Sequence, residues 1–425
     1  MLATLSGAWL DLWFVASAVL IWFMIGYQFA LFVAGLIYSR RFSRRAATAP
    51  ADDWPCVSII VPARNEARVI AQTIRTLTAL DYPADRFDIT IVDDGSTDAT
   101  AEIVAALAAA DPRIRCFRVP DGEAGRGKAA ALNGVFSALR HELIAIYDAD
   151  NRPEPPSLRR LVAEMVQTPQ LAAAVGKFRT LNRDRTLLTR FISIEGLAFQ
   201  WIVQAGRCAL LGVTTLPGTN FVIRRSVLDE VGGWDPEALT EDAELSIRIY
   251  ETGRRIRFVP HAVTWEQEPE TLGIWFRQRR RWARGHNYVL AKHLRRLLHL
   301  RPKVLAIELL YTLATYYVVF AAILVSDILF VLGGLGLVSI HALGPYSEIW
   351  LLAFALFLLE VTIALSRERG EDSLINLLLV VAGYFTYCQL WIPVVACAFA
   401  DDVLRRRRIW IKTERFAEAG GEAEP

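Results

Sequence analysis

Acidic residues come directly after apolar runs at two places in the middle of the chain. Asp93 and Asp94 follow the run Ile89–Val92, and Asp148 and Asp150 follow the run Leu143–Tyr147. If these runs are parallel strands, the carboxylates lie at the carboxyl ends of the strands, where ligands bind. A hard divalent cation such as Mg²⁺ takes carboxylate oxygens together with substrate phosphates. The Asp148/Asp150 pair therefore suggests a cation site, although an Asp-x-Asp pair is also common in turns.

Two further motifs are ambiguous when each is considered alone. Thr240-Glu241-Asp242 opens an apolar-periodic helix, and acidic residues in a first turn ordinarily complement the helix dipole. The segment 122–129 nearly matches the phosphate loop G-x-x-x-x-G-K-[ST], but Ala129 replaces the hydroxyl residue that would hold Mg²⁺. The sequence therefore disfavours an NTPase and favours a loop that brings Lys128 near a substrate phosphate.

The elements that must position these residues alternate in type. Short apolar runs predict buried strands, and segments of helical periodicity separate them; the strands are expected at Val57–Val61, Ile89–Val92, Ile114–Val119 and Leu143–Tyr147. This alternation predicts an α/β fold with a doubly wound, mostly parallel sheet. The five cysteines show no zinc or disulfide spacing.

Long apolar segments flank this stretch on both sides. They are Leu10–Tyr38, Val304–Val338, Ile349–Leu365 and Ile375–Ala400. The first is too long for a signal peptide and is followed by four arginines, which stay on the cytoplasmic side. We therefore expect a multi-pass protein of the inner (plasma) membrane with a cytoplasmic catalytic domain. The formal net charge of +2 argues against a nucleic-acid partner.

The number of C-terminal spans is ambiguous. One anchor plus three later spans would place Arg405–Arg408 outside, against the positive-inside tendency. An extra hairpin within Val304–Val338, or an interfacial placement of part of Ile375–Ala400, would bring the tail inside. Length favours three later spans, whereas charge favours an even number.

A basic stretch with interleaved aromatic residues, from Leu272 to about Leu298, is typical of an interfacial amphipathic helix. Within it, Arg279 and Arg280 are expected to contact lipid headgroups. The predicted division of the chain is an anchor and linker (1–52), a catalytic domain (53–268), interfacial helices (269–303), transmembrane helices (304–404) and a basic, then flexible tail (405–425).

In combination the motifs are more specific than each is alone. The chain resembles the processive, membrane-integrated family 2 glycosyltransferases, which include cellulose, hyaluronan, chitin and poly-N-acetylglucosamine synthases. The similarity covers roughly Trp54–His286 and the anchor-before, spans-after layout. The matching motifs, in the family order, are Pro62-Ala63-Arg64-Asn65-Glu66, Asp93–Asp98, Gly127-Lys128, Asp148-Ala149-Asp150, Thr240-Glu241-Asp242 and Gln278-Arg279-Arg280-Arg281-Trp282.

The resemblance implies a GT-A fold that uses a UDP-sugar, with UDP-N-acetylglucosamine or UDP-glucose as the leading donors, and Mg²⁺ or Mn²⁺ as cofactor. By this resemblance Asp242 is the catalytic base and Asp150 the metal ligand. The implied substrate-binding residues are Asp94 at the uridine, Lys128 near the nucleotide, Asp148 at the cation–diphosphate, Gln278, Arg281 and Trp282 at the diphosphate and acceptor, and Glu66 and Glu241.

Three functions then compete. The first is an inverting synthase that builds a β-linked polysaccharide at the cytosolic membrane face and extrudes it, with or without a partner subunit. The second transfers a sugar to a membrane lipid acceptor without extrusion. The third is a non-enzymatic, membrane-tethered sugar-nucleotide-binding subunit, which the full set of carboxylates disfavours.

Overall fold

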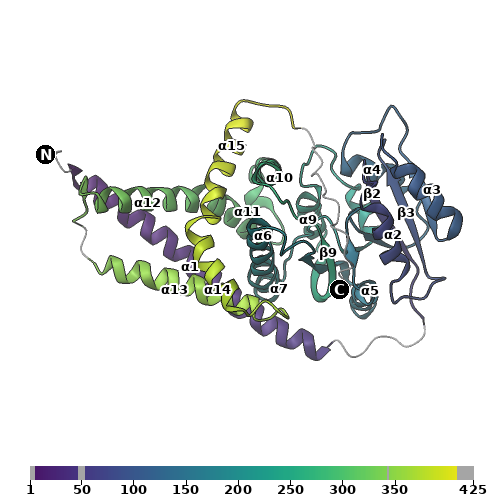
Figure 1. The fold of residues 1–425 in the computed structure, drawn as a ribbon, viewed down its shortest axis with the longest axis horizontal. Helices are drawn as coiled ribbons and strands as arrows, with labels where there is room; N and C mark the ends of the chain where they lie inside the picture. The colour runs from purple at the N-terminus through teal and green to yellow at the C-terminus, as the bar shows by residue number, and fades with distance from the viewer. Residues whose placement is uncertain (1–4, 46–52, 342–343, 409–425) are drawn as a thin grey trace.

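The computed structural model describes residues 5–45, 53–341 and 344–408. A mixed sheet with covering helices forms one end of the molecule, and long apolar helices extend from it to the other end (Figure 1). Residues 46–52, 342–343 and 409–425 lie outside the described residues, so the first and last predicted segments, 1–52 and 405–425, can be compared only in part.

Eight strands form the large sheet in the order β4-β3-β2-β5-β8-β7-β9-β6. Their bounds are β2 Val57–Ala63, β3 Phe87–Asp93, β4 Ile114–Arg118, β5 Leu143–Ile146, β6 Arg152–Pro153, β7 Leu171–Thr180, β8 Phe221–Arg224 and β9 Arg255–Glu266. The four predicted strands, β2 to β5, pair in parallel. Strand β8 then runs antiparallel between β5 and β7, and β6 runs antiparallel to β9, so the sheet is mixed.

Both faces of the sheet are covered, which explains why its central strands are apolar throughout. Alternate residues of β2 point to opposite sides: Ile59 packs with one core cluster and Ile60 with another. The first face carries α2 Ile70–Thr78, α3 Thr100–Ala110 and α5 Ser157–Gln167. The second carries α4 Lys128–Phe136, α8 Arg225–Val231 and α9 Glu241–Glu251.

The core cluster on the second face of the sheet also joins the sheet domain to the apolar helices. The first apolar helix is α1 Ala8–Arg45, and its Leu31 is fully buried. Leu31 lies beside a continuous helical run, which consists of α6 Leu187–Ala198, the π-helical η1 Phe199–Gln204 and α7 Ala205–Leu210. A Cβ on Gly206 would lie 2.3 Å from the Leu31 carbonyl oxygen, so only glycine permits this approach of α7 to α1.

Four helical segments are long and apolar enough to cross a membrane among the residues described: Ala8–Arg40, Val304–Gly334, Glu348–Leu365 and Leu374–Val403. They match the predicted segments closely. The second comprises α11 Val304–Leu313, the π-helical η3 Ala314–Val319 and α12 Phe320–Gly334, and the third lies within α13 Tyr346–Leu365. Two-residue strands, β1 Leu5–Ser6 and β10 Val338–Ser339, pair at the far end of the bundle.

The fourth segment is not one straight helix. It consists of α14 Leu374–Phe385, a short 3₁₀ turn at Cys388–Leu390, and α15 Trp391–Val403, and at Thr386 the backbone leaves helical geometry. Helix α15 runs across the direction of α12 and packs against α10 Leu272–Leu294 (Figure 1). The segment therefore starts beside α6, bends near Thr386 and ends against α10, and we call this bent segment the hairpin.

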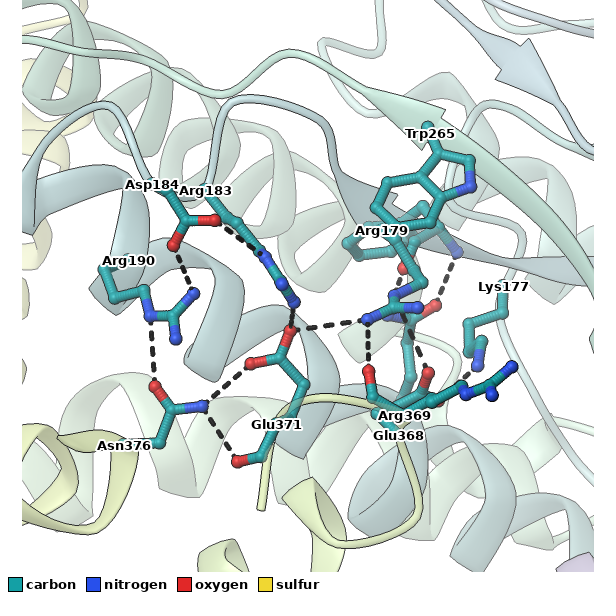
Figure 2. A network of polar contacts seen from close by, with 12 residues as sticks. Lys177, Arg179, Arg183, Asp184, Arg190, Trp265, Glu368, Arg369, Glu371 and Asn376 are labelled. Atoms are coloured by element: carbon teal, nitrogen blue, oxygen red, sulfur yellow. Dashed lines mark hydrogen bonds and ion pairs between the residues drawn. The ribbon is translucent and has the colours of Figure 1, made fainter. Parts of the chain in front are cut away.

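Polar contacts hold both ends of this hairpin against the sheet domain or α10. Ahead of the hairpin in the sequence, Glu368 and Glu371 are buried against β7 and against the residues that follow β7 (Figure 2). Glu368 accepts from the Trp201 indole at 2.7 Å and pairs with Lys177. After the hairpin, Arg284 of α10 donates to the backbone carbonyls of residues 406 and 407.

We expect the buried network to contribute strongly to stability. Glu371 has a side chain only 1% exposed, and it pairs with Arg179 and Arg183. Glu371→Gln removes the carboxylate that two guanidinium groups share and leaves them with Glu368 and Asp184, which should cost about 2 kcal/mol and lower the unfolding midpoint in detergent. Asp184→Asn is the matched control, because Asp184 pairs with Arg183 from a 70% exposed position. Equal losses in the two variants would contradict this account.

Candidate active site

All ten predicted site residues line one cavity of about 590 Å³. They come from six separate parts of the chain: Glu66 after β2, Asp94 after β3, Lys128 at the start of α4, Asp148 and Asp150 after β5, Glu241 and Asp242 at the start of α9, and Gln278, Arg281 and Trp282 on α10. The carboxylates that follow the parallel strands thus meet in one cavity, and α10 borders this cavity on the side of the apolar helices.

Asp94 is held by the loop that nearly matches a phosphate loop. The Gly125 N–H donates to Asp94 Oδ1 at 2.8 Å, and Gly125 has a φ of +78°. A Cβ at Gly125 would come within 2.6 Å of the Arg64 guanidinium, so this glycine lets the loop close over the site. Burial raises the pKa of Asp94, and the Gly125 hydrogen bond opposes that rise.

Lys128 joins two of the acidic motifs. Its Nζ donates to Asp148 Oδ1 at 2.5 Å and to the Gly218 carbonyl oxygen at 2.7 Å. Burial alone would lower the pKa of Lys128, but the neighbouring Asp148 and Glu241 carboxylates raise it, so the ammonium group stays charged. Gly218 adopts a φ of +87°, and a Cβ there would lie 3.2 Å from Asp242 Oδ2. The backbone of residue 218 thus packs directly against the predicted base.

The two acids of α9 do not serve only the helix dipole. Burial raises the pKa of Asp242, and the nearby Lys128 ammonium lowers it in part. Burial, together with the charge of Asp242, raises the pKa of Glu241 to about 7. Two carboxyl groups in one buried site, beside a single lysine, are suited to hold and transfer a proton near neutral pH.

Asp150 is 3% exposed, and its Oδ2 accepts the backbone N–H of Gln267 at 3.1 Å. No group of three or more His, Cys, Asp or Glu side chains with metal-binding geometry occurs among the residues described. The oxygen ligands of Asp148 and Asp150 fit a hard cation that takes its remaining ligands from a diphosphate.

Helix α10 brings the last motif to the cavity. Gln278, Arg281 and Trp282 line it, as do Arg279 and His286. The expectation that Arg279 contacts lipid headgroups is wrong, because this side chain is buried within the protein. For Arg280, whose side chain is 34% exposed, the expectation stays a prediction. Arg279 is 2% exposed and donates to Glu195 Oε2 at 2.8 Å, and Arg280 pairs with Asp401 of α15.

Other cavity residues lie outside the ten predicted ones. Thr219 accepts from the Asp148 N–H at 3.0 Å, and Gly218 belongs to the same loop. Part of the cavity wall comes from α11, η3 and neighbouring helices, and we call this part of the cavity the arm. The arm is lined by Arg207, Leu305, Glu308, Leu309, Tyr311, Thr312, Thr315, Tyr316, Phe320 and Trp391. Glu308 stands out in the sequence as an acid within an apolar run, but the others belong to an apolar span or an unremarkable helix and have no local signature.

The sheet, its carboxylate edge and the basic helix over it together define a glycosyltransferase of the GT-A type. The family model "Glycosyltransferase like family 2" matches residues 55–285. The chain is also 40% identical over 409 residues to the probable glycosyltransferase YdaM of Bacillus subtilis, covering 95% of this chain and 97% of that protein. The chain belongs to family 2 of the glycosyltransferases, which confirms the predicted enzyme class.

Other relatives differ in their products. The β-monoglucosyldiacylglycerol synthase of Synechocystis is 32% identical over 56% of this chain and 49% of its own length. The poly-β-1,6-N-acetyl-D-glucosamine synthase of Staphylococcus epidermidis is 29% identical over 56% of each chain. The chain therefore spans about half the length of each.

Among solved structures, the mannosyltransferase PcManGT of Pyrobaculum calidifontis, in complex with GDP-Man and Mn²⁺, superposes with a TM-score of 0.57. It is 21% identical, covering 94% of this chain and all of that one, and this likeness confirms the fold.

Proposed function

We propose that the protein is an inverting glycosyltransferase that transfers a sugar from UDP-sugar to a growing β-linked glycan at the cytosolic membrane face. The observation that carries the proposal is a single cavity that joins the strand-end carboxylates to an arm along the membrane helix segment α11–η3. Hydroxyl, aromatic and charged side chains line that arm at Glu308, Tyr311, Thr312, Thr315 and Tyr316, a lining that suits sugar hydroxyls better than hydrocarbon.

The chemistry follows from the charges in the site. Asp242 takes the proton of the acceptor hydroxyl while that oxygen attacks C1 of the donor sugar. The C1–oxygen bond to the diphosphate breaks with its electron pair, and UDP leaves from the opposite face. Arg281 and Lys128 stabilise the negative charge that develops on the phosphate oxygen. An α-linked donor therefore gives a β-linkage.

The remaining residues bind and orient. Asp94 would contact the uridine, Glu66 and Glu241 would form the wall of the donor site, and Gln278 would contact the diphosphate. Asp148 and Asp150 would hold Mg²⁺ or Mn²⁺, which when bound neutralises the diphosphate as a Lewis acid. Trp282 offers an aromatic face to the terminal acceptor sugar.

The hairpin supports an orientation for the whole chain. Both of its ends contact the catalytic domain or α10, so the basic residues Arg405–Arg408 lie on the same side as that domain. We propose that α1, α11–α12 and α13 cross the membrane, that α14–α15 enters it and returns, and that the catalytic side is cytosolic. This arrangement removes the conflict with the positive-inside tendency.

A lipid acceptor is the second candidate. Leu305, Leu309 and Phe320 line the arm beside its polar residues, and an apolar wall within a membrane helix would accept a lipid chain. The two candidates differ in product size. With radiolabelled donor, a ladder or a high polymer supports glycan synthesis, and a single organic-soluble glycolipid supports the lipid acceptor.

The test of the enzyme itself is UDP release by the purified full-length protein across several UDP-sugars, with and without EDTA. GDP-mannose is included, because the archaeal neighbour carries GDP-Man. We expect release with UDP-N-acetylglucosamine or UDP-glucose. No nucleotide release from any donor, under conditions in which the protein is folded, would refute the proposal.

The pH dependence tests the carboxyl pair. Because burial raises the pKa of Asp242, we expect the acid limb of kcat/KM to lie at higher pH than an ordinary aspartate, at 3.8, would give. Burial and the Asp242 charge raise the pKa of Glu241 to about 7, so Glu241 is largely protonated at the pH of that limb, and Glu241→Gln should leave the limb in place. A wild-type limb at the pH of an ordinary aspartate, or a limb that moves in Glu241→Gln, would contradict this assignment.

A further inference from the structure

A carboxylate outside the predicted motifs connects three elements at the acceptor side of the cavity. Glu195 of α6 accepts from Arg279 Nη2 at 2.8 Å and from the Tyr387 hydroxyl at 2.7 Å, both on Oε2. Its Oε1 accepts from the Trp391 indole N–H at 2.7 Å. The partners come from α10, from the break in the hairpin and from the start of α15.

Arg279 in turn contacts two residues of the α10 motif, Gln278 before it and Trp282 after it. Its Nη1 donates to Gln278 Oε1 at 3.0 Å, and its guanidinium carbon lies 4.0 Å from the centre of the Trp282 ring. A guanidinium at that distance over an indole is an attractive cation–π contact, and it is stronger where water is excluded. The planar fork of arginine can stack and donate at once, which a lysine cannot do.

We propose that Glu195 is a positioning residue for acceptor transfer, because it fixes Arg279 in the place that orients the Trp282 ring and the Gln278 amide. This rests on the proposed function, in which Trp282 contacts the acceptor sugar. Without the Glu195 carboxylate, Arg279 loses its buried countercharge, and the two residues it supports lose a fixed partner.

The same carboxylate ties the acceptor site to the hairpin. Tyr387 and Trp391 lie at the break between α14 and α15, and Tyr387 also accepts from the Trp275 indole at 3.1 Å. The bend of the hairpin thus contacts the part of the cavity wall that Glu195 and Arg279 form. A small displacement of an orienting group is enough to cost a large factor in rate.

The test separates transfer from donor hydrolysis in membranes that contain the full-length protein. Radiolabelled UDP-sugar yields label in polymer or lipid product when transfer succeeds, and free sugar when water is the acceptor. For Glu195→Gln we expect the ratio of transferred to free sugar to fall at least about 10-fold, with total donor consumption within about threefold. Arg279→Lys, which keeps the charge but loses the stacking plane, should lower the same ratio.

Arg280→Gln is the matched control. Arg280 is the next residue on α10 and is also ion-paired, to Asp401, but it does not line the cavity. We expect its ratio to match wild type. The proposal is overturned if Glu195→Gln and Arg279→Lys keep the wild-type ratio, or if transfer and hydrolysis fall together. If the wild type itself consumes no donor, the proposed function fails instead. Should Glu195→Gln not fold, Arg279→Lys decides.

Discussion

Replacing Asp242 with asparagine is expected to lower kcat by at least about 100-fold, on the scale of a general-base contribution. Asparagine has nearly the same shape, so it keeps the packing against Gly218 and the start of α9, but it cannot accept the proton of the acceptor hydroxyl. Donor binding should survive, because Lys128 and Asp148 keep their contact. The measurement is steady-state UDP release, with donor affinity from calorimetry.

Asp229→Asn serves as the control for this variant. Asp229 lies on α8 with its side chain 59% exposed, and it does not line the cavity. We expect wild-type turnover from it. If Asp242→Asn retained more than about a tenth of the activity, the base would have to be another group, with Glu241 the first to examine. Intact function in cells would favour a non-enzymatic sugar-nucleotide-binding role.

The parallel half of the fold was predictable because each strand there is a short apolar run bounded by turn residues. Val57–Ala63 and Leu143–Ile146 lie where those runs predict them. The other half was not, because the direction of β8 Phe221–Arg224 depends on its pairing with β5 and β7, which are distant in the sequence. Local patterns carry no information about such pairing.

A similar limit applies to the site. Asp94, Asp150 and Asp242 could be found because they occur in recognisable short motifs, and the structure brings them to one cavity. Glu195 could not, because a single acid in an amphipathic helix has no local signature, and its partners Arg279 and Trp391 are far away in the sequence. The position of the break at Thr386 is likewise hidden, since Leu374–Val403 as a whole is long and apolar enough to cross a membrane.

Removal of divalent cations is expected to reduce activity by about 1,000-fold, and added Mg²⁺ or Mn²⁺ should restore it. The reason is charge: a leaving UDP carries more negative charge than Lys128 and Arg281 can neutralise alone, and a Lewis acid at this point contributes several kcal/mol. Asp150→Asn should raise the cation concentration needed for half-maximal rate, because a carboxylate ligand is lost.

The matched control is EDTA added together with an excess of Mg²⁺, which separates chelation from any direct effect of the chelator. A second readout is UDP binding by calorimetry, which should weaken in EDTA for the wild type and change less for Asp150→Asn. Turnover that persists unchanged after exhaustive chelation would remove the cation from the mechanism. Charge stabilisation would then rest on Lys128 and Arg281, both of which line the cavity.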